Sequence, residues 1–183
     1  MKLTEKRLDG TTIYEGRIIT VINDKVELEN GTVSAREVVR HPGGVCVAAL
    51  SDDRCIYLVR QFRYPYQEVV VELPAGKLDK GNENPLEAGK RELLEETGIV
   101  ADHYYDLGKL YPSPGYCDEI ISMYVATGLH FRQQQLDEGE FLEVEKMPLA
   151  QAVDLVLKGE IKDSKSQAAI LKLSILLERG IIE

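Results

Sequence analysis

Glutamates crowd the segment from Gly76 to Ile99, whose sequence is GKLDKGNENPLEAGKRELLEETGI. They are Glu83, Glu87, Glu92, Glu95 and Glu96. On a helix, Glu92 and Glu96 would be neighbours with Glu95 beside them, and such like-charge pairs destabilise a helix by roughly 0.2–0.5 kcal/mol each. A bound cation would reverse that cost. Because no His or Cys lies in this segment, the oxygen ligands favour a hard cation, Mg²⁺ or Mn²⁺.

The same segment carries signals for both ends of the helix. Asn84 followed by Pro85 predicts the start, because Asn caps free backbone N–H groups and Pro suits the first helical position. Glu87 stands where a capping-box carboxylate reaches back to Asn84. Thr97 followed by Gly98 predicts the end, because Gly readily takes the left-handed conformation.

One side of the predicted helix is apolar. Leu86, Leu93 and Thr97 fall on one stripe at helical spacing, with Leu94 beside it, so we expect this stripe to face the core. Arg91 could pair with a carboxylate and orient it for a cation. The alternative is a solvated acidic face, which is common. The glycine-rich turn before the helix and the order R-E-L-L-E-E-T-G favour the metal site.

Length and composition are typical of a small globular enzyme. The 183 residues, 44% hydrophobic and 29% charged, predict one domain with extra elements. The net charge of −9 argues against nucleic-acid binding, and an anionic substrate would need metal ions and placed arginines. Three irregularly spaced cysteines (Cys46, Cys55 and Cys117) indicate reduced thiols. With no apolar signal core or membrane-spanning run, we expect a cytoplasmic location and no membrane partner.

Alternating apolar and polar residues predict strands on both sides of the helix. Residues 3–40 hold several candidates, and Asn30-Gly31 is a strong hairpin signal. Further strands are predicted at residues 45–50, 55–61, 68–73, 106–111, 120–126 and 140–144, and helices at 147–158 and 164–179. Strands interrupted by a few long helices indicate an α/β (α+β) layered sandwich.

The acidic segment resembles the Nudix box, G-x5-E-x7-R-E-U-x-E-E-x-G-U, in which U is aliphatic. The matching residues are Glu83, Arg91, Glu92, Leu93, Glu95, Glu96, Gly98 and Ile99. Gly76 lies one residue further from Glu83 than in this pattern, which we interpret as a single insertion in the turn at residues 77–82.

Shorter segments are similar to the ADP-ribose pyrophosphatase subgroup. They are VRQFRYP at 59–65, VELPAG at 71–76, SPGYCDE at 113–119 and DEGEFLEV at 137–144. The subgroup carries a proline beyond its box, and Pro114 fits that position.

The resemblance implies a Nudix-type α/β/α sandwich with a mixed central sheet over residues 41–183, preceded by an N-terminal β-hairpin extension over residues 1–40. Members of the subgroup are homodimers that exchange this region, so we expect residues 1–40 to be the dimerisation element. The extension could instead bury its own apolar residues, which include Ile18, Ile19, Val21 and Val26.

The resemblance also implies the reaction, the Mg²⁺-dependent hydrolysis of ADP-ribose to AMP and ribose 5-phosphate. Glu92 and Glu96 would be the principal metal ligands, Glu95 a third, and the carbonyl of Ala75 a backbone ligand by family analogy. Another nucleoside diphosphate sugar, such as GDP-mannose, is the alternative substrate. A non-catalytic nucleotide-binding module is a remote alternative, because the box glutamates are all present.

A separate carboxylate should accept the proton of the attacking water. The family places this base on a mobile loop after the sheet, which indicates Glu140, with Gly139 giving the loop freedom. Glu119, which follows the turn at Ser113 to Gly115, is the rival base or a metal ligand. Glu138 is a weaker rival.

Arg63 is the candidate phosphate clamp, because a guanidinium can hold two phosphate oxygens. A surface salt bridge is its alternative role. Glu72 could bind a ribose hydroxyl or the base edge, or could be a buried partner of Arg63. Ser113 and Gly115 are further predicted substrate-binding residues. Base recognition stays open, with stacking candidates at Tyr14, Tyr64, Tyr66 and Tyr116; His41 is expected to be structural.

Overall fold

The computed structural model describes residues 2–78 and 83–182. The insertion expected in the turn at residues 77–82 therefore lies largely outside the described residues. The chain forms two compact units. One comprises Met1–Gly43 and Tyr111–Ile120, and the other comprises Gly44–Leu110 and Ile121–Glu183. Among the described residues, no helix combines the length and apolarity needed to cross a bilayer.

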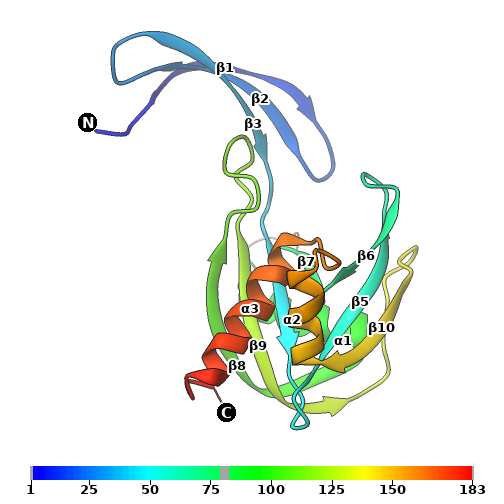
Figure 1. Cartoon of the computed structure of the whole chain (residues 1–183). Helices are drawn as coiled ribbons and strands as arrows, with labels where there is room; N and C mark the ends of the chain where they lie inside the picture. Colours follow the sequence, from blue (N-terminus) through cyan, green and yellow to red (C-terminus); the bar gives the residue numbers. More distant parts are fainter. Residues whose placement is uncertain (1, 79–82, 183) are drawn as a thin grey trace. The chain divides into compact units, whose positions relative to one another are not determined.

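The first unit is built on an antiparallel sheet with the order β1 (Lys6–Glu15), β2 (Thr20–Glu27) and β3 (Val33–Arg40) (Figure 1). The predicted hairpin joins β2 and β3, with Gly31 at a φ of 80°. The segment at residues 111–120 pairs with the end of β3, because Val39 N–H donates to the Tyr116 carbonyl at 2.7 Å.

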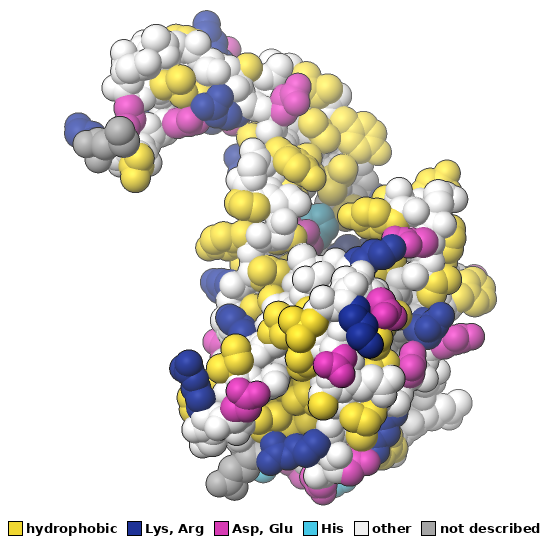
Figure 2. All heavy atoms as spheres, in the orientation of Figure 1, with side chains coloured by type: hydrophobic (Ala, Val, Ile, Leu, Met, Phe, Trp, Pro, Cys, Tyr) yellow, Lys and Arg dark blue, Asp and Glu magenta, His cyan; other side chains and the backbone are white. Residues whose placement is uncertain are grey.

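Several large apolar side chains of this unit remain exposed. Figure 2 shows hydrophobic side chains on its surface, and the exposed ones include Leu8, Ile13, Tyr14, Ile18 and Val33. Of the apolar residues expected to be buried in a core or in a dimer, Val26 is buried within this structure. The sheet therefore leaves apolar surface uncovered.

The second unit contains two sheets. A mixed sheet has the order β7 (Ala75–Lys77), β4 (Gly44–Ala49), β9 (Ile121–Phe131) and β8 (Ile99–Leu110), with β4 and β9 parallel. An antiparallel sheet has the order β10 (Leu142–Pro148), β5 (Cys55–Arg63) and β6 (Glu68–Glu72). The mixed sheet confirms the predicted fold class.

Helices cover both faces of the mixed sheet. They are α1 (Pro85–Thr97), α2 (Leu149–Leu157) and α3 (Ser164–Glu178) (Figure 1). Side chains alternate along a strand, and β4 is buried throughout. Cys46 and Ala48 join the core cluster that contains residues of α2 and α3, whereas Val47 and Ala49 pack with Leu93 of α1. This alternation confirms the α/β/α layers.

Helix α1 begins and ends where the sequence predicts. Asn84 Oδ1 accepts from Leu86 N–H at 2.9 Å, and Gly98, in the left-handed conformation, donates to the Leu94 carbonyl at 2.8 Å. The Glu87 side chain pairs with Lys90 at 2.7 Å in place of the expected capping-box bond.

The buried face of α1 differs from the predicted stripe. Leu93 is buried as expected, but the others on this face are Ala88, Gly89 and Glu96, and Leu86 and Thr97 are only partly buried. The small residue Gly89 lets the helix approach Val45 and Val47 of β4 closely. This close approach rotates the helix so that Glu96 points inward.

Strand boundaries also differ from the predictions. β8 begins at Ile99 and β9 ends at Phe131, well beyond the predicted limits, because the two strands pair along their whole length. β10 begins at Leu142, so Glu140 lies in the turn before the strand, where its N–H donates to the Asp137 carbonyl at 3.0 Å.

Candidate active site

Arg91 organises the exposed side of the acidic helix. Its guanidinium lies 3.1 Å from Glu83, 2.7 Å from Glu92 and 2.7 Å from Glu95. Burial disfavours the charge of Arg91, but hydrogen bonds with these carboxylates outweigh it and raise its pKa. Arg91 therefore holds three carboxylates together, in the orienting role that the sequence suggests.

Glu96 lies in a different environment from the other box glutamates. Its side chain is 3% exposed, and Oε2 accepts from the backbone N–H of Ala75 at 3.0 Å. The pKa of Glu96 is raised to about 8, mainly by burial and also by the nearby charges of Glu140 and Glu92, which together outweigh the Ala75 hydrogen bond and the charge of Arg63. The buried carboxylate lacks a cationic partner strong enough to keep it ionised at neutral pH.

Strand β7 packs directly against the acidic helix. A Cβ atom on Gly76 would overlap the carboxylate of Glu92 in its present position, so glycine leaves room for this position of the side chain. Burial also raises the pKa of Glu92, although Arg91 partly opposes this. The backbone of Ala75 and Gly76 therefore lies beside Glu92 and Glu96.

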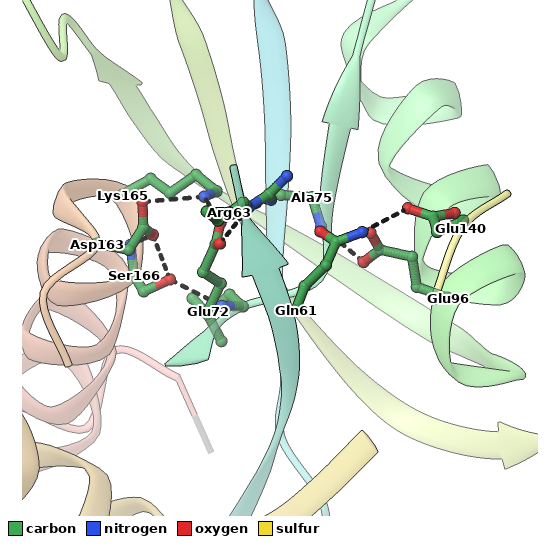
Figure 3. A network of polar contacts seen from close by, with 10 residues as sticks. Gln61, Arg63, Glu72, Ala75, Glu96, Glu140, Asp163, Lys165 and Ser166 are labelled. Carbon is green, nitrogen blue, oxygen red and sulfur yellow. Dashed lines mark hydrogen bonds and ion pairs between the residues drawn. The ribbon is translucent and has the colours of Figure 1, made fainter. Parts of the chain in front are cut away.

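Glu140 approaches the same carboxylates from the turn before β10. Gln61 of β5 donates from Nε2 to Glu140 Oε1 at 3.2 Å, and Figure 3 shows Glu140 beside Glu96. The charge of Glu140 raises the pKa of both Glu92 and Glu96. Gln61 was not singled out from the sequence, because its partner is 79 residues away. Its Oε1 is buried and has no hydrogen-bond partner among the described residues.

The donor set in this region fits a hard divalent cation. Its donors are oxygens, and the pKa values of Glu92 and Glu96 are raised by burial and by neighbouring carboxylates, both of which a bound cation would oppose. Within the described part of the chain, no three His, Cys, Asp or Glu side chains converge closely enough to hold an ion as placed. Arg91 engages Glu92 and Glu95 in this arrangement.

Arg63 and Glu72 form a bidentate ion pair between β5 and β6. Arg63 donates from Nε to Oε1 at 2.5 Å and from Nη2 to Oε2 at 2.9 Å. The hydrogen bond to Glu72 raises the pKa of Arg63, and the charge of Glu96 also contributes, so Arg63 lies within electrostatic reach of the acidic helix. Of the two roles considered for Glu72, the arrangement matches that of a buried partner for Arg63.

A further set of residues on and before α3 joins this pair. Lys165 donates to Glu72 Oε2 at 2.5 Å and lies 3.0 Å from Asp163. Ser166 Oγ accepts from Leu73 N–H at 2.7 Å and donates to Asp163 at 2.6 Å (Figure 3). The contacts of Lys165 with Glu72 and of Ser166 with Leu73 each join residues 93 positions apart, and the sequence carries no signal for them.

Three of the predicted site residues belong to the other unit. Ser113, Gly115 and Glu119 lie in the segment that pairs with β3. The Ser113 carbonyl accepts from Cys117 N–H at 3.0 Å, and Glu119 lies 3.4 Å from His41 Nδ1. His41 Nδ1 also accepts from Gly43 N–H at 3.1 Å, as a structural turn histidine would. The structure brings together Arg63, Glu72, Ala75, Glu92, Glu95, Glu96 and Glu140 within the second unit.

Comparisons with known proteins agree with this arrangement. The family model described as NUDIX domain matches residues 40–169, and that described as nucleoside diphosphate sugar hydrolase N-terminal domain matches residues 5–39. The chain is 42% identical over 175 residues to the ADP-ribose pyrophosphatase of Bacillus subtilis (strain 168), a match that covers 94% of each protein. It is 41% identical over 173 residues to the methanol dehydrogenase activator of Bacillus methanolicus, covering 93% of each. A crystal structure of an ADP compounds hydrolase superposes with a TM-score of 0.83 at 26% identity, covering 97% of both chains.

Proposed function

This chain belongs to the Nudix family and is a hydrolase of that family, and from this premise we propose that it hydrolyses ADP-ribose to AMP and ribose 5-phosphate with Mg²⁺. The observation that carries the proposal is the buried Glu96 facing the Ala75 backbone, beside Glu92, in a chain similar over nearly its whole length to an ADP-ribose pyrophosphatase. In this reaction one water adds across the diphosphate: its oxygen bonds to one phosphorus, and the bridging oxygen leaves with the other.

The proposed ligands of Mg²⁺ are the side chains of Glu92, Glu95 and Glu96 and the backbone carbonyl of Ala75. Mn²⁺ could take the place of Mg²⁺. When bound, the cations would neutralise the diphosphate and lower the pKa of the attacking water. Arg91 orients the carboxylates, since it contacts Glu92 and Glu95 at 2.7 Å. The Gly76 backbone supports this assignment, because it leaves room for the Glu92 carboxylate.

Glu140 is the proposed general base. It stands close enough to Glu92 and Glu96 to raise their pKa values, and it lies at the end of a turn whose Gly139 takes a φ of 85°. Gln61 orients the Glu140 carboxylate in this arrangement. Glu119 and Glu138 remain the alternative bases, and the effect of each substitution on turnover separates them.

Arg63 is the proposed clamp on the diphosphate. Its Nε and Nη2 groups are engaged by Glu72, whereas Nη1 has no hydrogen-bond partner among the residues described. The Arg63 side chain as a whole is 38% exposed and so reaches solvent. Ser113 and Gly115 are further proposed contacts to substrate.

Residues 1–40, which form the sheet of the first unit, are the proposed dimerisation element. This sheet exposes apolar side chains such as Ile13, which is 64% exposed, and exposed sheets of this kind are commonly covered by another chain. We therefore propose a homodimer.

The free thiols of Cys46, Cys55 and Cys117 suit a reducing compartment, which supports a cytoplasmic location.

A substrate panel tests the proposed reaction. Wild-type protein is incubated with Mg²⁺ and with ADP-ribose, GDP-mannose or a UDP-sugar, and the released nucleoside monophosphate is quantified. We expect the highest kcat/KM for ADP-ribose, with AMP and ribose 5-phosphate in equal amounts. Because a relative of nearly equal identity bears the name of a dehydrogenase activator, a panel with no turnover of any compound would overturn the enzymatic proposal, and a preference for GDP-mannose would overturn the substrate.

A further inference from the structure

We propose that Lys165 is a positioning residue for Arg63, which it orients through the shared carboxylate of Glu72 so that the guanidinium presents a free edge to a diphosphate and its positive charge is not outweighed by the carboxylates behind it. This inference rests on the proposed function for the identity of the ligand. It assigns a role in substrate binding to the first turn of α3, a helix that carries none of the proposed metal ligands.

The contacts form a directed chain from the interior to the surface. Lys165 and Glu72 have side chains 11% and 4% exposed, whereas Arg63 is 38% exposed. Glu72 is therefore gripped from two sides, by an ammonium from the interior and by a guanidinium that reaches solvent. Arg63 contacts both oxygens of Glu72, and Lys165 contacts Oε2 from the interior side, so Lys165 restrains the carboxylate that the guanidinium fork grips.

Charge balance gives Lys165 a second effect. The two positive charges, on Arg63 and Lys165, balance the two negative charges, on Glu72 and Asp163. The exposed guanidinium therefore keeps its attraction for an anion. Burial disfavours the charge of Lys165, but Asp163 and Glu72 outweigh it and raise its pKa, so Lys165 is a cation. Without that cation, two carboxylates would stand behind one guanidinium and repel a diphosphate.

The same turn of α3 also fixes the backbone that follows Glu72. Ser166 Oγ accepts from Leu73 N–H, and Asp163 in turn accepts from Ser166. Two residues further on, Ala75 N–H donates to Glu96. The segment from Glu72 to Ala75 is therefore held by α3 at one end and by α1 at the other, which places Arg63 at a set position relative to the acidic helix.

A double-mutant cycle distinguishes positioning from a merely structural role. We would prepare Lys165→Met, Arg63→Met and the double variant, and measure the Kd of inorganic pyrophosphate by calorimetry in Mg²⁺ buffer, together with kcat and KM for ADP-ribose. Lys165→Met should weaken pyrophosphate binding about 10-fold in the wild-type background but less than about 2-fold when Arg63 is already Met. KM should rise more than kcat falls, because the clamp acts on binding.

Lys162→Met is the matched control. Lys162 lies three residues before Lys165, ahead of the first residue of α3, and pairs with Glu68 at 2.8 Å, so its substitution removes the same charge without removing a hydrogen bond of the network. We expect its Kd and kinetic constants to equal those of the wild type. If Lys165→Met does not fold, Lys165→Gln, which retains a donor for Glu72, replaces it in the cycle.

The outcomes test the positioning role of Lys165 and the identity of the proposed substrate separately. Additive effects in the cycle, or an unchanged Kd in Lys165→Met, would overturn the positioning role even if ADP-ribose is hydrolysed. Coupled loss of pyrophosphate affinity without ADP-ribose turnover would support the positioning role and refute the substrate. A wild-type protein that binds neither ligand would refute both.

Discussion

Glu96 of the acidic helix accepts a hydrogen bond from the backbone N–H of Ala75 at 3.0 Å, across 21 residues of sequence. The bond ties α1 to the short strand β7 and sets a buried carboxylate beside a backbone carbonyl. The Glu96 side chain therefore contributes both to the packing of α1 on β7 and to the proposed metal binding. Substitutions of Glu96 can separate these two roles.

Glu96→Gln should abolish most turnover while leaving the fold intact. The amide oxygen can still accept from Ala75, but it cannot supply the charge that a divalent cation needs. We expect kcat to fall by at least about 100-fold. Loss of a residue that only hydrogen-bonds to a metal ligand typically costs about 10–100-fold, and loss of a ligand itself should cost at least as much. Steady-state kinetics at saturating Mg²⁺ and a thermal melt in EDTA check this. Near-wild-type activity would show that Glu96 is not a ligand.

The stability of the metal-free protein should fall as pH rises from about 5 to about 8. The pKa of Glu96 is raised from 4.5 in the unfolded chain to about 8 in the folded protein. In that window the folded state therefore binds more protons than the unfolded state, and the free energy of unfolding decreases with pH. The total effect of such a shift is on the order of a few kcal/mol.

Urea denaturation in EDTA at several pH values measures how the free energy of unfolding changes with pH. Glu96→Gln serves as the comparison, because it removes the contribution of Glu96 and should reduce the slope, leaving the part that the raised pKa of Glu92 contributes. Glu72 titrates at lower pH, since the net effect of Arg63 and Lys165 is to lower its pKa despite burial. A wild-type slope equal to that of the variant would contradict the assignment of the buried proton to Glu96.

Gly76→Ala should impair activity with little loss of stability. The added Cβ would overlap the carboxylate of Glu92, and that flexible side chain can swing away without moving backbone. We expect the Mg²⁺ concentration for half-maximal activity to rise about 10-fold or more, the scale of outer-shell perturbations, while the melting temperature in EDTA changes little. An unchanged Mg²⁺ dependence would mean that the position of Glu92 against β7 is unimportant for the cation.

Glu140→Gln should lower kcat far more than KM, because a general base acts in the transition state. Loss of proton transfer typically costs about 10²–10⁴-fold in rate. Glu138→Gln and Glu119→Gln, assayed in parallel, should retain most of their kcat. If Glu140→Gln keeps its turnover number and one of the others loses it, the base moves to that residue.

Ile13→Lys should weaken the proposed dimer. Ile13 is 64% exposed on β1, and a lysine there would place a charge in an apolar interface. Sedimentation equilibrium at micromolar concentration should find the wild type dimeric and the variant mostly monomeric. Leu157→Lys, at a 74% exposed position of the other unit, is the control and should stay dimeric. A monomeric wild type would rule out the interface.

Helix α1 was predictable from the sequence because its signals are local. The cap at Asn84, the stop at Gly98 and the carboxylates at Glu92 and Glu96 all lie within the turn-and-helix segment. The hairpin at Asn30-Gly31 followed for the same reason, and the alternation of strands and helices along the chain indicated the layered class of the fold. The direction in which Glu96 points was not predictable, because close packing of Gly89 on β4 sets the rotation of the helix.

By itself the sequence determined the acidic helix and the layered class of the fold, and its oxygen ligands are the basis on which a hard divalent cation is proposed. Only the tertiary structure decided which partners those residues meet. Gln61 reaches Glu140 across 79 residues, and Lys165 reaches Glu72 across 93. Helix caps and hairpin turns are encoded by neighbouring residues, whereas these contacts arise from the packing of β5, β6 and α3, for which no local period or motif exists.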